Sequence, residues 1–231
     1  MLDVIEDTAS QKGTGKLTSQ FAFDLGVPVP TISAALEARN ISALKGERTE
    51  ASGSIRHETM DADMDEEEFA AAARDALYGS MIAAYAQGFA VLRAAAEEPE
   101  DEHGGACAME LGPGGVADLW KGGCIIRSSL LYPIQETFQD RPDLPNLLTA
   151  PRFRDVLNDG DFQSNWRRFI ATLTARGLPR NALSASLGYV DDYSTERLAA
   201  DMIQGQRDRF GRHGFRRTDR EGEDFHLEPA D

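Results

Sequence analysis

The chain has 231 residues, of which 39 are acidic and 24 basic, and its formal net charge is −15 at pH 7. This charge opposes the electrostatic attraction that drives binding to nucleic acid and to anionic membranes, so we expect neither partner. No apolar run is long enough for a membrane span and the start lacks a signal-peptide pattern, which predicts a cytoplasmic protein. The length is sufficient for one large domain or two small ones.

The first distinctive stretch is QKGTGKLT, residues 11–18, in which glycines and lysines surround a threonine. A Walker A loop requires GxxxxGK followed by Ser or Thr, but Ser10 stands at the first glycine and Leu17 follows Lys16. A dinucleotide fingerprint requires a preceding strand, and ten mostly polar residues leave no room for one. We therefore expect a GTG turn and a helix that begins near Lys16 or Leu17 and ends near Gly26.

This turn has two possible interpretations, a phosphate site or a solvated loop. Backbone amides at the start of a helix, the hydroxyl of Thr14 and the ammonium of Lys12 can together hold one phosphoryl group. Turns rich in glycine and lysine also precede helices that bind no ligand. The residues of the turn by themselves leave both interpretations open.

The clearest helical signal lies at residues 65–96, where apolar side chains recur at steps of three or four. This period predicts one long amphipathic helix, suited to the spine of a large helical domain. The acidic run Asp65–Glu68 lies where the helix dipole is positive, so we interpret it as a helix start rather than a ligand site. Residues 97–115 contain Pro99, an acidic patch and five glycines, and are predicted to form a loop.

Shorter helices are predicted after this loop, and no alternating run is long enough to propose a sheet. They are expected at residues 114–120, 125–138, 151–176, 183–189 and 197–210. Asp159 and Gly160 are expected to break the third of these helices in two. The predicted fold is therefore all-α, with a helical domain at residues 1–211 and a C-terminal tail at residues 212–231.

The two cysteines, Cys107 and Cys124, are too few for a disulfide framework and lack the paired spacing of a zinc site, so we expect no metal. Cys124 is predicted at the buried start of a helix. We interpret it as structural rather than nucleophilic, because the sequence fixes no partner histidine.

Four segments, spread over most of the chain, together resemble the C-terminal all-helical domain of 6-phosphogluconate dehydrogenase. They are, in chain order, QKGTGKLT, LGVPVPTISAALEARNISALKGER, LWKGGCIIRSSLL and DMIQGQRDRFGRH. The resemblance runs from about Asp7 to His226 and includes the closing RRTDREGEDFHLEP. It implies an oxidative decarboxylation of 6-phosphogluconate to ribulose 5-phosphate in the pentose phosphate pathway, with NADP as the hydride acceptor.

The resemblance also implies a role for five residues. Lys12 and Thr14 match the family's KGTGK turn, which contacts the substrate phosphate, and Arg39 matches an arginine of the same site. Arg207 and His213 match an arginine and a histidine that one subunit contributes to the pocket of the other, so the resemblance implies a homodimer. Three cations around a dianion, one of them an arginine that can grip two oxygens, form a physically sensible phosphate site.

Without the resemblance, two of these residues would have plainer interpretations. Arg39 would be a helix-surface arginine paired with Glu37 or Glu47. His213 would be a tail histidine in water.

The family places its nucleotide-binding Rossmann domain, its catalytic lysine and its catalytic glutamate before the KGTGK turn. We expect these parts to be absent from the 231 residues, so no catalytic residue is assigned and the NADP site would belong to a separate nucleotide-binding half. Lys16 is not a substitute base, because a base must reach the substrate hydroxyl. Two functions stay open: the substrate-binding and dimerising part of a 6-phosphogluconate dehydrogenase, or a non-catalytic dimeric phosphosugar-binding or scaffold protein.

Overall fold

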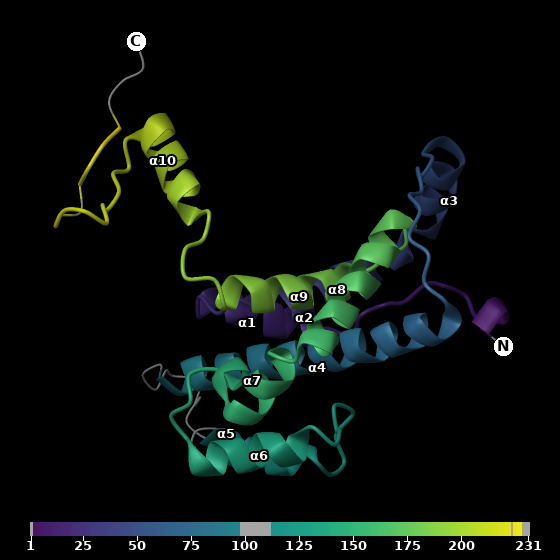
Figure 1. The fold of residues 1–231 in the computed structure, drawn as a ribbon, viewed down its shortest axis with the longest axis horizontal. Coiled ribbons are helices and arrows are strands. Elements are labelled where there is room, and N and C mark those ends of the chain that lie inside the picture. Colours follow the sequence, from purple (N-terminus) through teal and green to yellow (C-terminus); the bar gives the residue numbers. More distant parts are fainter. Residues whose placement is uncertain (1, 98–111, 223, 228–231) are drawn as a thin grey trace. The chain divides into compact units, whose positions relative to one another are not determined.

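A computed structural model describes residues 2–97, 112–222 and 224–227. Its contacts divide the chain into two units, Met1–Val190 and Asp191–Asp231. All regular elements among the described residues are helices, and the β-structure there is one isolated antiparallel bridge between Phe215 and Phe225, so the predicted all-α fold is confirmed (Figure 1). The functional division predicted at residue 211 stays a prediction.

The first unit contains the 3-10 helices η1 and η3, the α-helices from α1 to α8 and the first ten residues of α9. Its elements are η1 (Leu2–Val4), α1 (Thr14–Asp24), α2 (Pro30–Ala43), α3 (Lys45–Ser54), α4 (Glu66–Glu97), α5 (Gly112–Trp120), α6 (Leu131–Asp140), η3 (Leu147–Thr149), α7 (Pro151–Leu157), α8 (Gly160–Ala175) and α9 (Asn181–Tyr193), whose last three residues belong to the second unit. The second unit continues with α10 (Ala200–Gly211) and the residues that follow it.

The longest helix, α4, forms the spine of the first unit, and its bounds nearly coincide with the predicted 65–96. The carboxylate of Asp65 accepts a hydrogen bond from the N–H of Glu68 at 2.8 Å. The acidic run therefore caps the positive end of the helix, which confirms its interpretation as a helix start.

The main core of the first unit lies between α4 and the helices that follow it in the chain. Trp166 of α8, Phe153 of α7 and Ile134 of α6 are almost completely buried and join the apolar face of α4 in one cluster. Gly79 of α4 lies so close to the indole of Trp166 that a Cβ at this position would be 2.5 Å from a ring carbon. The absence of a side chain at Gly79 thus allows α8 to pack this closely against α4.

Helices α1 and α2 pack on α4 through a second, smaller cluster that contains Ala22, Val29 and Val91. Gln87 of α4 is fully buried, and its amide pairs twice with Thr31 at the start of α2. The N–H of Thr31 donates to Oε1 at 3.0 Å, and Nε2 donates to the Thr31 hydroxyl at 2.7 Å. These bonds fix the start of α2 on α4, and with it the part of the chain that holds the predicted phosphate site.

The helix predicted at residues 125–138 begins later, at Leu131, so this start was wrong. Side chains offer the preceding backbone other partners: the hydroxyl of Tyr85 donates to the carbonyl of Ile126, and the N–H of Leu130 donates to the hydroxyl of Ser128 at 3.2 Å. Such bonds compete with helix formation. Cys124 consequently lies in a turn and is partly buried, which corrects its predicted place at a buried helix start.

Other boundaries differ by smaller amounts. Helix α1 begins at Thr14, before the predicted Lys16, because Gly13 can adopt the left-handed conformation that opens it. Helix α9 is longer at both ends than the predicted 183–189, and α2 and α3 were not predicted from periodicity. The predicted break at Asp159 and Gly160 is confirmed, since α7 ends just before it and the Asp159 carboxylate caps α8 at the N–H of Phe162.

Of the helices that the structure describes, none combines the length and the apolar character needed to cross a bilayer. Cys107 and nearly all of the acidic segment at residues 97–112 lie outside the described residues.

Candidate functional site

The turn at Lys12 and Gly13 opens α1 with an uncapped N-terminus. Gly13 has φ of 97°, a left-handed conformation, and no side chain caps the helix. The first helical bond runs from the N–H of Leu17 to the carbonyl of Gly13 at 2.9 Å. Within the described part of the chain, the N–H groups of Thr14, Gly15 and Lys16 have no acceptor. The positive end of the α1 dipole therefore faces outward with three free donors.

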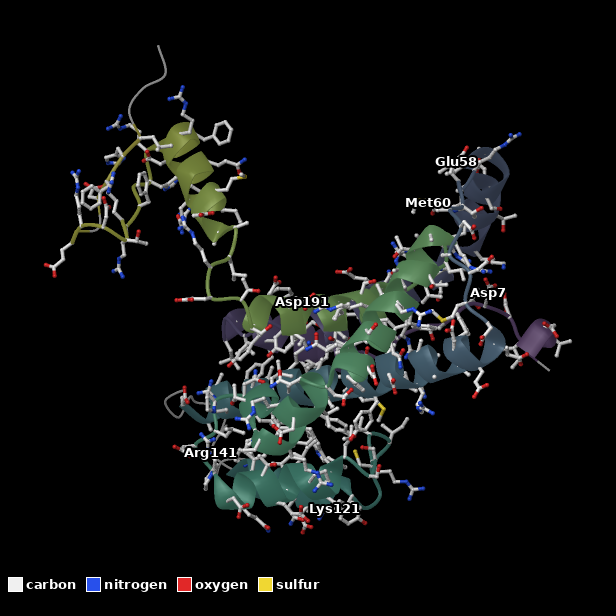
Figure 2. The ribbon with its side chains drawn as sticks, in the orientation of Figure 1. Asp7, Glu58, Met60, Lys121, Arg141 and Asp191 are labelled. Carbon is white, nitrogen blue, oxygen red and sulfur yellow. The ribbon has the colours of Figure 1, made fainter. Side chains whose placement is uncertain are left out.

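The residues before this turn, 7–10, form a short arm that is attached to α2 and α3. The arm begins at Asp7, which is labelled in Figure 2. The carboxylate of Asp7 accepts from Lys45 Nζ at 2.5 Å and from Arg48 Nη1 at 3.1 Å. These bonds, first from Lys45 and then from Arg48, lower the pKa of Asp7 to about 2. Asp7 is therefore ionised at neutral pH and holds the arm at the start of α3.

The arm is attached again just before the turn, at Ala9 and Ser10. The N–H of Ala9 donates to the hydroxyl of Ser42 at 2.9 Å, and Arg39 donates through Nη2 to the carbonyl of Ser10. Ser10 precedes Lys12 by two residues. The contact therefore brings the guanidinium of Arg39 next to the turn that carries Lys12.

The packing of α1 on α2 supports the same placement. A Cβ on Gly15 would lie 3.7 Å from a methyl group of Leu36, and Leu36 precedes Arg39 by three residues, on the same face of α2. Lys12, Thr14 and Arg39 are all exposed. The structure thus brings these three predicted residues into one neighbourhood at the start of α1.

The plainer interpretation of Arg39 predicted a salt bridge with Glu37 or Glu47. Among residues 2–97 and 112–222, Arg39 forms no ion pair, and its side chain donates to the carbonyl of Ser10. Lys12 has no hydrogen bond or ion pair within the same residues. Both cations are therefore available to an anion that binds at the turn.

Arg207 and His213 belong to the second unit, whereas Lys12, Thr14 and Arg39 belong to the first. Arg207 is exposed on α10 and donates to Oε1 of Gln204 at 3.1 Å. His213 follows the helix, and its ring lies over Gly211, where a Cβ would be 2.8 Å from Cδ2 and Nε2. The structure places this pair in one unit but does not place it relative to Lys12, Thr14 and Arg39.

Asp208, next to Arg207, is a residue that the sequence reasoning missed. Its side chain is buried, and its carboxylate accepts from the N–H of Gly214 at 3.0 Å, the N–H of Leu227 at 2.7 Å and Nδ1 of His226 at 2.6 Å. These partners, the N–H of Leu227 above all, lower the pKa of Asp208 to about 2. The available signal was an acidic residue between two arginines in RDR, but its partners lie as many as 19 residues away.

Two kinds of cofactor site can be tested among the described residues: a dinucleotide fingerprint at the GTG turn and a cluster of metal ligands. No strand precedes α1 in residues 2–13, so the strand, turn and helix of a dinucleotide fingerprint are not formed at the GTG turn. No group of three or more His, Cys, Asp or Glu among the described residues can hold a metal ion. We therefore derive no chemical step through NADP from these residues.

Comparisons with known proteins agree on one family. A family model described as "6-phosphogluconate dehydrogenase, C-terminal domain" matches residues 1–229. The "6-phosphogluconate dehydrogenase, NADP(+)-dependent, decarboxylating" of Bacillus subtilis is 44% identical over 229 residues, which are 99% of this chain and 46% of the relative. The "6-phosphogluconate dehydrogenase, decarboxylating 1" of Saccharomyces cerevisiae is 43% identical over 218 residues, which are 94% of this chain and 42% of the relative.

A solved structure extends this likeness to the fold. It is the 6-phosphogluconate dehydrogenase of Plasmodium falciparum, described in its apo form and in complex with its cofactor NADP+ and its substrate 6-phosphogluconate. The TM-score is 0.85 at 35% identity, over 98% of this chain and 47% of that chain. The chain spans about half the length of the curated relatives it matches. It belongs to the family of 6-phosphogluconate dehydrogenase C-terminal domains.

Proposed function

We propose that this chain supplies the substrate-phosphate site and the dimer interface of an NADP-dependent 6-phosphogluconate dehydrogenase, which converts 6-phosphogluconate to ribulose 5-phosphate. The observation that carries the proposal is the contact of Arg39 with Ser10, which gathers Arg39, Lys12 and Thr14 at the uncapped start of α1. The relatives are decarboxylating 6-phosphogluconate dehydrogenases, and the Plasmodium falciparum enzyme binds both 6-phosphogluconate and NADP+.

The chemistry of this neighbourhood suits a phosphate dianion. The free N–H groups of α1 and the hydroxyl of Thr14 can donate to phosphate oxygens, and the ammonium of Lys12 adds a positive charge. Arg39 has five N–H donors and uses Nη2 on Ser10, so other donors of its planar fork remain for the phosphate. Lys12 and Arg39 form no ion pair with the residues that the structure describes, so binding would break none there.

Arg207 and His213 would complete the pocket from the second subunit of a homodimer. His213 can donate to a hydroxyl or a carboxylate of the sugar acid, and Arg207 adds a further cation. NADP, held by a separate nucleotide-binding part, would accept the hydride. The residues of this chain would then bind and orient the substrate, which lowers a barrier by fixing the reacting geometry.

We expect 6-phosphogluconate to raise the melting temperature of the wild-type chain, because a ligand that binds only the folded state stabilises it, by about 2.7 kcal/mol at a concentration 100-fold above Kd. Arg39→Ala should abolish this rise. The matched control is Arg168→Ala, which removes an exposed arginine paired with Glu68 on another face of the same unit. Differential scanning fluorimetry with and without 6-phosphogluconate measures the difference.

Arg39 also holds the arm, so a second variant separates binding from folding. Lys12→Ala removes an exposed cation that has no partner among the described residues, and the melting temperature without ligand should stay unchanged. The rise caused by 6-phosphogluconate should nevertheless shrink. Equal rises in the wild type and in both variants would remove Lys12 and Arg39 from the site.

A non-catalytic dimeric phosphosugar-binding or scaffold protein is the second candidate function. The observation in its favour is that the gathered residues Lys12, Thr14 and Arg39 are all held by helices and an arm of the first unit alone. Binding of 6-phosphogluconate is expected for the dehydrogenase part and for a phosphosugar-binding protein, but not for a pure scaffold. Addition of a nucleotide-binding half distinguishes them, because turnover would then appear in the first case only.

A further inference from the structure

The two residues next to His213 in the chain both form hydrogen bonds with Asp208. On the N-terminal side, the N–H of Arg212 donates to the backbone carbonyl of Asp208 at 2.7 Å. On the C-terminal side, the N–H of Gly214 donates to the carboxylate of Asp208 at 3.0 Å. Because Asp208 also follows Arg207 directly in α10, one residue links the backbones of both predicted substrate contacts.

The same carboxylate is fixed from its other side by the returning chain. The N–H of Leu227 and Nδ1 of His226 donate to it at 2.7 and 2.6 Å, and Nε2 of His226 lies 3.1 Å from Asp224 Oδ1. Phe215 and Phe225 exchange two backbone hydrogen bonds at 2.9 and 3.2 Å, so the returning chain is paired with the segment just after His213. We call residues 208, 214 and 224–227 the clamp.

Two close approaches leave the clamp little freedom. Gly214 has φ of 69°, and a Cβ there would be 2.8 Å from the carboxylate of Asp224. The ring of His213 lies over Gly211 at a similar spacing. A buried carboxylate with three donors is also costly to move, because each lost donor would leave a charged group without compensation. The backbone around His213 is therefore held in one geometry.

We propose that Asp208 is a positioning residue, which acts through the clamp to hold His213 and Arg207 in the geometry that 6-phosphogluconate requires. The proposal rests on the proposed function of that pair. Asp208 is buried and all of its carboxylate partners belong to the chain, so its effect on binding would be indirect. Residues 224–227 acquire a role through it, since they hold the carboxylate in place.

Asp208→Asn in the full chain tests the proposal. The N–H groups of Gly214 and Leu227 donate to different oxygens of Asp208. Asparagine has an NH2 group in place of one of these oxygens, so one of the two N–H donors would face another donor. We expect the Kd for 6-phosphogluconate, measured by calorimetry, to rise about tenfold or more. The matched control is Asp201→Asn on the same helix, an exposed carboxylate paired with Arg197, which should change the Kd by less than about twofold.

A thermodynamic cycle separates positioning from a general structural role. If Asp208 acts through His213, Asp208→Asn should weaken binding far less in a His213→Ala background than in the wild type. The same factor in both backgrounds would overturn the proposal. His226→Ala keeps the carboxylate and its two backbone donors, so it should weaken binding less than Asp208→Asn does. If neither Asp208→Asn nor His226→Ala weakens binding, the proposal is also overturned.

Nuclear magnetic resonance without ligand keeps this test independent of the proposed function. In Asp208→Asn, the amide signals of Gly214 and Leu227 and the ring signals of His213 should shift or broaden, while those of α4 should not. If the wild type binds no 6-phosphogluconate, the proposed function fails. The ring signals of His213 still show whether the clamp holds His213 in place. Unchanged ring signals of His213 in Asp208→Asn would overturn the positioning role.

Discussion

The two glycines that flank Thr14 differ in what their backbones require. Gly13 has φ of 97° and nothing within 4 Å of an added Cβ, so a side chain there would be strained by its backbone alone. Gly15 is helical, and its added Cβ would make ordinary contact with Leu36 at 3.7 Å. The turn therefore needs glycine at position 13 and tolerates alanine at position 15.

We expect Gly13→Ala to lower the free energy of unfolding by about 1 to 2 kcal/mol, because an L-residue is disfavoured in the left-handed region. Gly15→Ala should raise it by up to about 1 kcal/mol, because alanine is the better helix former. Urea denaturation of the two variants beside the wild type measures both changes. A change of the same sign in both would contradict the argument.

Individual site residues differed in how far the sequence could predict them. Lys12 and Thr14 lie in one short turn, so their closeness is local and follows from the pattern. The contact of Arg39 with Ser10 joins α2 to the arm, and only the resemblance linked Arg39 to the site. Asp208 was not predicted because its role depends on where the chain returns at Leu227, which no local pattern shows.

Helices α4 and α8 depend on one close approach, and this contact can be tested at the scale of the element. Gly79→Ala would place a Cβ 2.5 Å from the ring of Trp166, which is buried in the core and has little room to move. We expect a loss of about 1 to 3 kcal/mol in the free energy of unfolding, as for other overpacked cores. Thermal or urea unfolding followed by circular dichroism measures this loss.

Gly88 provides the control on the same helix. Nothing lies within 4 Å of a Cβ added there, so Gly88→Ala should stabilise α4 by up to about 1 kcal/mol. Equal destabilisation of both variants would mean that the contact with Trp166 is not the reason why Gly79→Ala lowers stability.

Elements with a strong internal period could be predicted, and those defined by tertiary partners could not. The regular apolar spacing of α4 and the capping Asp159 before α8 gave bounds close to those observed. The start of α6 is set by Tyr85 and Ser128, which act from outside the helix or just before it. Helix α2 begins at Pro30 and is fixed by Gln87, a partner 56 residues away.

For the whole molecule, we expect a homodimer. Helix α10 exposes Met202, Ile203 and Phe210, the last at 89%, and apolar side chains gathered in this way are typical of a surface that meets another chain. Light scattering after size-exclusion chromatography at micromolar concentration gives the mass. A mass of one chain under these conditions would contradict the expectation.

We also expect the 231-residue chain, assayed alone, to form no NADPH from NADP and 6-phosphogluconate. The GTG turn forms no dinucleotide fingerprint, and the resemblance assigns no catalytic acid or base to these 231 residues. The full-length Bacillus subtilis relative serves as the positive control in the same absorbance assay. NADPH formation by the pure chain at ordinary enzyme concentration would show that this reasoning is wrong.

The attachment of the arm at Asp7 has a consequence for anything covalently joined ahead of it. An extended stretch from Asp7 to Lys12 spans at most roughly 17 Å, and Lys45 and Arg48 hold its near end. A polypeptide fused ahead of Asp7 would therefore be tethered to the helical unit at a point within roughly 17 Å of Lys12. Its reactive groups would be present there at high effective concentration, whatever their affinity in free solution.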